Sequence, residues 1–219
     1  DLRMLSPGSG SGSHEIRFAR QGIFAGITCM DIAQNLLDKA RQISLDMGLE
    51  NMEFICADAH DYEFGTGRYD VILFHASLHH FRDIDRLIGK KLIHALKADG
   101  ILVINEYIGP DRLQFPRKQI RNVNRALKSI PPEYRRRFRM RMLKNRVSGP
   151  GILRMLIADP SEARESSRIM ATLDRYLDRV EVKPYGGNIL MPVLKDIAHH
   201  FISESQEPCE ILEELFRIE

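Results

Sequence analysis

The chain has 219 residues, of which 43% are hydrophobic and 28% are charged. This composition excludes a disordered polymer, and the length suits one globular domain spanning residues 1–219. No apolar run approaches the roughly 18 residues that a membrane span needs, and no secretion signal is visible. A formal net charge of +2 does not by itself indicate a nucleic acid or a membrane as partner. Because Asp1 begins a predicted strand, we expect further residues to precede it.

The charges are distributed unevenly along the chain. Segment 111–146 has a net charge of +11, which leaves −9 for the other residues. Its two acidic residues are Asp111 and Glu133. Its basic residues are Arg112, Arg117, Lys118, Arg121, Arg125, Lys128, Arg135, Arg136, Arg137, Arg139, Arg141, Lys144 and Arg146. This pattern predicts an acidic body that carries a strongly basic insert.

The cysteines point to a reducing compartment. There are three, Cys29, Cys56 and Cys209, and the first two lie in apolar runs. An odd number of such residues is typical of free, buried thiols. We therefore expect a cytoplasmic protein.

Strand-like and helix-like segments alternate through the first half of the chain. Apolar runs predict strands at 2–5, 25–30, 52–57, 71–74 and 101–105. Helical spacing of apolar residues predicts helices at 14–20, 33–47 and 84–96, the last closed by an Asp99-Gly100 turn. Because parallel strands need crossover helices, this alternation predicts a doubly wound α/β fold with a mostly parallel sheet.

The alternation stops after Glu106. Residues 107–158 are predicted to form a basic, helical insert, and Asp159-Pro160-Ser161-Glu162 has the cap and first-turn residues of a new helix. Beyond it we expect a sixth strand at 180–183 and a weaker strand candidate at 188–191. The last expected elements are helices at 193–202 and 208–216.

Glycines alternate with small residues where the first strand turns into a helix. Gly8, Gly10 and Gly12 would let a ligand approach the backbone and meet free N–H groups, so an anionic ligand group is expected there. Asp31 and Asp58 end the second and third strands. In open α/β sheets such strand ends share one crevice, which is where ligands bind. A nicotinamide-dependent oxidoreductase using the same crevice is one alternative, although the spacing differs from its glycine fingerprint.

Five segments, in order, resemble the motifs of class I S-adenosylmethionine-dependent methyltransferases. They are Gly8-Ser9-Gly10-Ser11-Gly12, Met30-Asp31-Ile32, Cys56-Ala57-Asp58-Ala59, residues 69–81 and residues 96–104. The resemblance covers residues 1 to 106 and implies a Rossmann-like fold with S-adenosyl-L-methionine as cofactor.

The resemblance also implies roles for individual residues. The methionyl part of the cofactor would lie on Gly8, Ser9, Gly10 and Gly12. Asp31 would hold the ribose hydroxyls, Met30 and Ile32 the adenine faces, Asp58 and Ala59 the adenine edge, and His75 would lie near the methyl donor. Ser6 stands where the family usually has an acidic residue, and Glu15 could supply the missing charge. No metal site is expected.

A sulfonium methyl is already activated, so the protein must chiefly align a nucleophile, exclude water and, for some acceptors, remove a proton. The candidate bases are His79, His80, Glu106 and Tyr107, which follow the fourth and fifth strands. For His79 and His80, packing in a turn is the more common role.

The basic insert has three interpretations. The first is a solvated helical face, the usual role of clustered charge. Our preferred hypothesis is a lid that selects a small, acidic methyl acceptor, because Arg135, Arg136, Arg137, Arg139 and Arg141 lie within seven residues. An RNA-directed methyltransferase is the alternative, weakened by the few aromatic residues available for stacking.

Overall fold

The computed structural model describes residues 1–203 and 205–219. Within them the chain forms two compact units. Unit 1 comprises Asp1–Arg112 and Met155–Arg179, and unit 2 comprises Leu113–Arg154 and Val180–Glu219. The basic insert therefore does not stand alone, because the C-terminal segment joins it in unit 2. That the whole chain is one domain with a lid at 107–158 stays a prediction.

Unit 1 is built on a five-stranded parallel sheet, which confirms the predicted α/β class. Its order is β3-β2-β1-β4-β5, so the winding reverses between β1 and β4. The strands are β1 (Leu2–Pro7), β2 (Phe24–Asp31), β3 (Met52–Cys56), β4 (Tyr69–His75) and β5 (Leu96–Asn105). In a doubly wound sheet the crevice for ligands opens at such a reversal, at the carboxyl ends of the strands.

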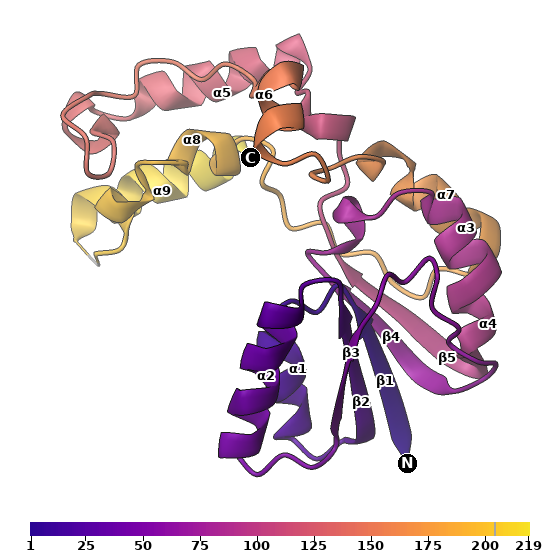
Figure 1. Ribbon diagram of the computed structural model, residues 1–219. Helices are drawn as coiled ribbons and strands as arrows, with labels where there is room; N and C mark the ends of the chain where they lie inside the picture. Colours follow the sequence, from indigo (N-terminus) through magenta and orange to yellow (C-terminus); the bar gives the residue numbers. More distant parts are fainter. Residues whose placement is uncertain (204) are drawn as a thin grey trace. The chain divides into compact units, whose positions relative to one another are not determined.

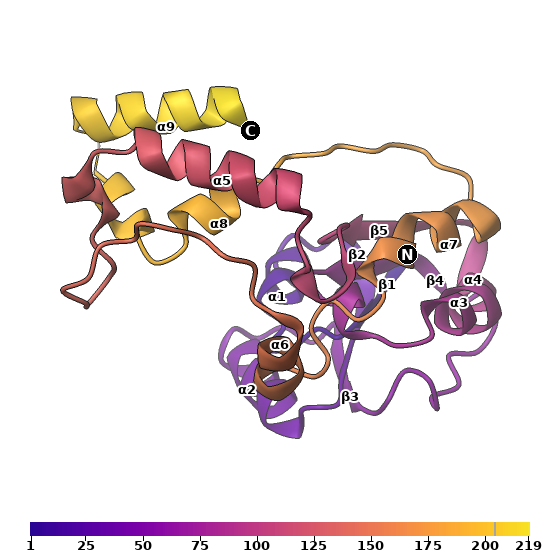
Figure 2. The same ribbon diagram turned by 90° about the horizontal axis from the view of Figure 1, so that it is seen from above.

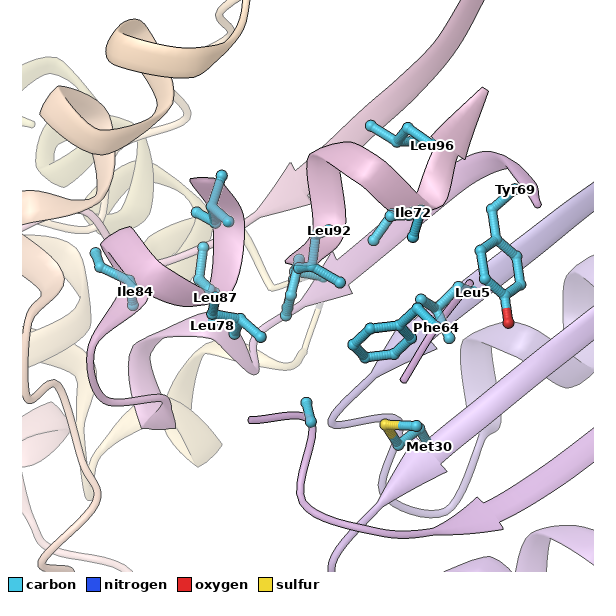
Figure 3. Close-up of a cluster of buried hydrophobic side chains, with 14 of the residues drawn as sticks. Leu5, Met30, Phe64, Tyr69, Ile72, Leu78, Ile84, Leu87, Leu92 and Leu96 are labelled. Atoms are coloured by element: carbon cyan, nitrogen blue, oxygen red, sulfur yellow. The ribbon is translucent and has the colours of Figure 1, made fainter. Parts of the chain in front are cut away.

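Helices cover both faces of this sheet (Figure 1). One face carries α1 (Ser13–Ala19) and α2 (Gln34–Asp46), and the other carries α3 (Ile84–Arg86), α4 (Ile93–Ala95) and α7 (Ile169–Tyr176). Each interface has its own buried apolar cluster. The larger cluster joins the sheet to the second group of helices, as Figure 3 shows for Ile72, Leu87 and Leu92.

The predicted helix at 84–96 contains an irregular turn. A π-helical stretch, Leu87–Leu92, connects α3 directly to α4. Here the ring of Tyr176, from α7, packs against Gly89, where an added Cβ would lie 2.3 Å from its Cζ atom. The Tyr176 hydroxyl also donates a hydrogen bond to Asp85 at 3.1 Å. Because Gly89 has no side chain, α7 can pack closely against the Leu87–Leu92 stretch.

The Asp99-Gly100 turn lies inside β5 rather than before it. Pairing with β4 passes from Tyr69–Leu96 to Val71–Ile101, so residues 97–100 bulge between the two registers. The strand is therefore longer than predicted, because Leu96 already pairs.

Unit 2 is helical. It contains α5 (Arg117–Ser129), α8 (Leu190–Leu194) and α9 (Gln206–Ile218), and α6 (Ile152–Ala158) crosses the boundary with unit 1. Figure 2 shows α5 beside α8 and α9, and a separate apolar core joins these three helices. Short 3-10 turns occupy Pro132–Arg135 and Ala198–Phe201 in unit 2. Two others, Leu78–His80 and Ser166–Arg168, belong to unit 1, and Asp111–Leu113 spans the point where the chain passes from unit 1 to unit 2.

Several predictions for the second half are wrong. No helix begins at Asp159. Its carboxylate accepts hydrogen bonds from the Ser161 and Glu162 amides in an isolated turn, and α7 starts only at Ile169. Residues 180–183 form no strand, and Val180 is 91% exposed. The candidate strand at 188–191 runs into α8 instead.

The two C-terminal helix predictions differ in outcome. The expected helix at 193–202 is divided between the end of α8 and the 3-10 turn Ala198–Phe201. The helix expected at 208–216 is confirmed as α9. Across the described residues, no helix is long and apolar enough to cross a lipid bilayer.

The three cysteines are free thiols, as expected. Their burial is only partly as predicted. Cys29 is buried in the sheet, whereas Cys56 is exposed because it ends β3 at the edge of the sheet.

Candidate functional site

The glycine turn follows β1 and depends on left-handed backbone. Gly8, Gly10 and Gly12 have φ angles of +71°, +54° and +65°, which residues with a Cβ adopt only at a cost. At Gly8 a Cβ would also lie 2.8 Å from the Cβ of Ser77, which follows β4. The Ser77 hydroxyl donates a hydrogen bond to the Pro7 carbonyl at 3.1 Å. The turn is thus held against the end of β4 at the reversal of the sheet.

Asp31 ends β2 and connects the turn to the next strand. Its Oδ2 accepts a hydrogen bond from the Gly10 amide at 2.8 Å, and its Oδ1 accepts one from the Ala33 amide at 2.9 Å. Each carboxylate oxygen can accept further hydrogen bonds. Asp31 can therefore orient the turn and still bind ligand hydroxyls, the role that the resemblance implies for it.

Asp58 follows β3 and forms a tight turn. Its Oδ1 accepts a hydrogen bond from the His60 amide at 2.8 Å. The His60 ring is buried, and its Nε2 has no hydrogen-bond partner within the described part of the chain. A buried polar atom without a partner is costly, so this nitrogen is suited to a polar group of a ligand.

These features meet at one cavity of about 510 Å³. The cavity lies at the carboxyl ends of β1 to β4, because the residues that follow each of these strands line it. Seven predicted cofactor residues border it: Gly8, Gly10, Met30, Asp31, Ile32, Asp58 and Ala59. The convergence of glycine turn and two carboxylates that we expected is therefore observed. The contacts with a cofactor that each residue would make stay predictions.

Three predicted cofactor residues do not line this cavity. Gly12 begins α1, and Ser9 donates its amide to the Met30 carbonyl at 3.0 Å. The His75 ring stacks on that of His14, with ring centroids 3.6 Å apart. The proposed place of His75 near the methyl donor stays a prediction.

Glu15 and Ser6 form a buried pair. The Ser6 hydroxyl donates a hydrogen bond of 2.6 Å to the Glu15 carboxylate, and the two residues are 1% and 2% exposed. Burial, and then the charge of Glu15, raise the pKa of the Cys29 thiol far above its usual range. Glu15 thus places a carboxylate beside Ser6, the position at which the methyltransferases that the sequence resembles usually have an acidic residue.

Two candidate bases, His79 and Glu106, form a tight pair. His79 Nδ1 and Glu106 Oε1 lie 2.5 Å apart, and the Glu106 side chain is fully buried. Burial alone would lower the pKa of His79, but the hydrogen bond and charge of Glu106 outweigh it and raise that pKa. The same pair lowers the pKa of Glu106 despite its burial. Glu106 thus holds the His79 ring in place.

The other two candidate bases differ in access. Burial and the nearby charges of Asp111 and Glu162 raise the pKa of Tyr107 to about 12, and its hydroxyl donates to the Pro110 carbonyl at 3.2 Å. Such a group is a poor base near neutral pH. His80 borders the cavity, unlike the other three candidates.

The sequence analysis missed several residues of the cavity. Arg82, Ser161 and Arg164 border it, together with Ala57, His60, Ala76, Ser77 and Phe81. His60 lies two residues after a predicted site residue, so that proximity was an available signal. Ser161 and Arg164 gave no signal, since only the fold brings the 160s to the strand ends.

In unit 2 the clustered arginines have neighbours of different kinds. The guanidinium of Arg137 pairs with Asp196 at 3.0 Å, and that of Arg139 lies 5.0 Å from the centroid of the Phe138 ring. Arg135 has a buried Nε with no hydrogen-bond partner among the described residues. Arg137 therefore has an acidic partner within the protein. The lid stays a prediction.

A parallel sheet with a glycine turn and acidic residues at its reversal defines a Rossmann-like, cofactor-binding protein. Comparison with known families is more specific. The methyltransferase domain family matches residues 1–180, and the chain belongs to that family. It thus contains a class I methyltransferase domain, the kind of domain whose cofactor is S-adenosyl-L-methionine.

Solved structures of similar fold include the YcgJ protein of Bacillus subtilis. It is 19% identical, with a TM-score of 0.56 over 96% of this chain and 81% of that one. An S-adenosylmethionine-dependent methyltransferase from Mesorhizobium loti is 21% identical, with a TM-score of 0.44 over 52% of this chain and 49% of that one. Phosphoethanolamine N-methyltransferase 2 of Haemonchus contortus, in complex with S-adenosyl-L-methionine, is 27% identical. Its TM-score is 0.43 over 47% of this chain and 24% of that one.

The extent of these matches is limited. The chain spans about half the length of several of the solved structures that it matches. No curated protein matches the sequence.

Proposed function

We propose that the protein transfers a methyl group from S-adenosyl-L-methionine to a small, acidic molecule. The observation that supports this is a single cavity bordered both by the glycine turn with Asp31 and by two cationic side chains, Arg82 and Arg164. The first group suits the cofactor, and the second suits an anionic acceptor, because guanidinium groups bind carboxylates and phosphates in pairs of hydrogen bonds.

The residues fit the cofactor on physical grounds. At the left-handed Gly10 an added Cβ would meet only a Leu36 methyl group at 4.0 Å, so the backbone here is open to a ligand. The unpartnered Nε2 of His60 matches a polar edge such as that of adenine. When bound, the cofactor supplies an activated methyl group on a sulfonium. Asp31 holds the ribose, and Met30, with a fully buried apolar side chain, forms a wall of the cavity.

The acceptor side must align a nucleophile with the methyl group and exclude water. Arg82 and Arg164 would bind the negatively charged group of the acceptor and so fix its orientation. Neither arginine would take part in the methyl transfer itself. We propose also that the protein acts in the cytoplasm, because all three of its cysteines are free.

The substitution Arg164→Gln tests this proposal. An anionic acceptor is first found by screening carboxylates and phosphates beside their neutral analogues. We expect the substitution to raise the KM for that acceptor about 10- to 100-fold, because one charge-assisted hydrogen bond contributes about that much to affinity. The affinity for S-adenosylhomocysteine, measured by calorimetry, should stay unchanged. Arg20→Gln, on an exposed residue after α1, is the matched control.

Two results would contradict the proposal. One is a preference for the neutral analogues in the screen. The other is a loss of S-adenosylhomocysteine binding in Arg164→Gln with no change in acceptor KM, because the arginine would then bind the cofactor.

A further inference from the structure

Two imidazoles and one carboxylate converge beside the cavity of unit 1. His79 and His80 lie in the 3-10 turn after β4, and Glu162 lies in the turn before α7. The Nε2 atoms of the two histidines are 3.7 Å and 3.9 Å from the same oxygen, Oε2 of Glu162. These distances exceed the roughly 2.7–3.2 Å of an N–H···O hydrogen bond. Direct hydrogen bonds therefore do not explain the arrangement.

The other nitrogen of each ring already has a partner. His79 Nδ1 is 2.5 Å from the Glu106 carboxylate, and His80 Nδ1 is 3.0 Å from the Ser161 hydroxyl. Histidines that bind metals are usually held in this way, because the second contact fixes the tautomer and the orientation of the ring. Both Nε2 atoms are thereby left to face Glu162.

We propose that His79, His80 and Glu162 bind a divalent transition-metal ion of the zinc class. Two imidazoles and a carboxylate are a donor set of catalytic zinc sites, and all the ligand atoms lie within 4.8 Å of one another. Tetrahedral zinc with bonds of about 2.0–2.1 Å separates its ligands by about 3.3 Å. The two Nε2–Oε2 distances, 3.7 and 3.9 Å, are only a few tenths of an ångström longer than this separation.

The charges around the ligands favour a cation. The carboxylates of Glu106, Glu162 and Asp159 all act on the His79 ring. Glu106 is fully buried, so its field on the histidines is weakly screened. These three carboxylates attract a divalent ion to the histidines.

The position of the site suggests a role. Three protein ligands leave a fourth position for water or for an oxygen of a bound molecule. His80 and Ser161 border the cavity, so the ion lies at its rim. In this proposal His79 and His80 are ligands rather than bases, which differs from the expectation of no metal site. The inference rests on three side chains and does not depend on the proposed methyl acceptor.

Metal binding by the whole chain, freed of metal with a chelator, tests the inference. We expect one Zn²⁺ per chain by calorimetry, and one Co²⁺ giving the visible absorption of a tetrahedral complex. Ligand removal by His80→Ala or by the isosteric Glu162→Gln should weaken binding at least about 100-fold, and Ser161→Ala about 10-fold, since supporting contacts contribute 10- to 100-fold.

Matched controls separate the site from the surface. His94→Ala and Glu50→Gln change exposed residues of the same types. Both variants should bind Zn²⁺ and Co²⁺ with the affinity of the unaltered chain. Thermal unfolding and S-adenosylhomocysteine binding, both without metal, report whether each variant is folded. The inference is overturned if the unaltered chain binds no ion, if Glu162→Gln binds as tightly as it does, or if the controls lose affinity equally.

Discussion

Gly8 illustrates how one residue supports the cavity. Its left-handed φ and its contact with Ser77 act together, because the first excludes most side chains and the second excludes any Cβ. We expect Gly8→Ala to lower the free energy of unfolding by about 2–4 kcal/mol, from backbone strain plus overpacking. The displaced turn should also weaken S-adenosylhomocysteine binding at least about 10-fold. Denaturant unfolding and calorimetry measure the two effects.

Gly22 provides the control for this substitution. Its φ is +67°, but a Cβ there would meet nothing within 4 Å. Gly22→Ala should therefore cost only the strain, about 1–2 kcal/mol, and leave the cofactor affinity intact. If the two variants lose equal stability, the contact with Ser77 has no energetic role.

At the scale of elements, Lys144 holds the end of α8. The residue is 3% exposed, and its ammonium donates hydrogen bonds to the carbonyls of Pro192, Val193 and Lys195 at 2.7, 3.0 and 2.5 Å. The last carbonyls of a helix lack partners within the helix. We expect Lys144→Met to destabilise unit 2 by about 2–3 kcal/mol, because buried acceptors lose their donor. Hydrogen exchange of the α5 and α8 amides measures the change.

Lys128, exposed in the last turn of α5, is the control. Lys128→Met should change the stability by less than about 0.5 kcal/mol, as exposed substitutions usually do. Equal exchange rates in the two variants would show that the three carbonyls find water or other donors without cost.

At the scale of the whole molecule, the two compact units share no apolar cluster among the described residues, which implies two units of unfolding. Leu127 is fully buried in the core of unit 2, and Leu92 is 1% exposed in that of unit 1. Leu→Ala at either site should cost about 2–5 kcal/mol. We expect Leu127→Ala to speed hydrogen exchange in α5, α8 and α9 alone, and Leu92→Ala to speed it in β1, β4 and β5 alone. If each variant speeds exchange throughout the chain, the units unfold together.

The two-unit organisation also limits what the sequence can predict. Charge identified a basic insert, but not that residues 180–219 would join it, because the apolar contacts between α5 and α8 are separated by about sixty residues of chain. The predicted strand at 180–183 fails for a related reason. Its β-branched residues favour a strand, yet in the described structure no neighbouring strand pairs with them, and Val182 is 54% exposed.

The failed helix start at Asp159 shows the same limit locally. The carboxylate accepts hydrogen bonds from the Ser161 and Glu162 amides, as a helix cap does. Caps and isolated turns use the same local chemistry, so only packing further along the chain determines whether a helix follows.

The amino-acid sequence by itself determined the parallel sheet, the glycine turn and the convergence of Asp31 with Asp58. The spacing of apolar residues and the turn residues are local properties of the chain, and parallel pairing brings the carboxyl ends of the strands to one edge of the sheet. The tertiary structure alone decided which distant groups complete the site. Glu106 reaches His79 across 27 residues, and Ser161 reaches His80 across 81. Such contacts depend on how elements pack, and packing is a property of the folded chain that no short segment encodes.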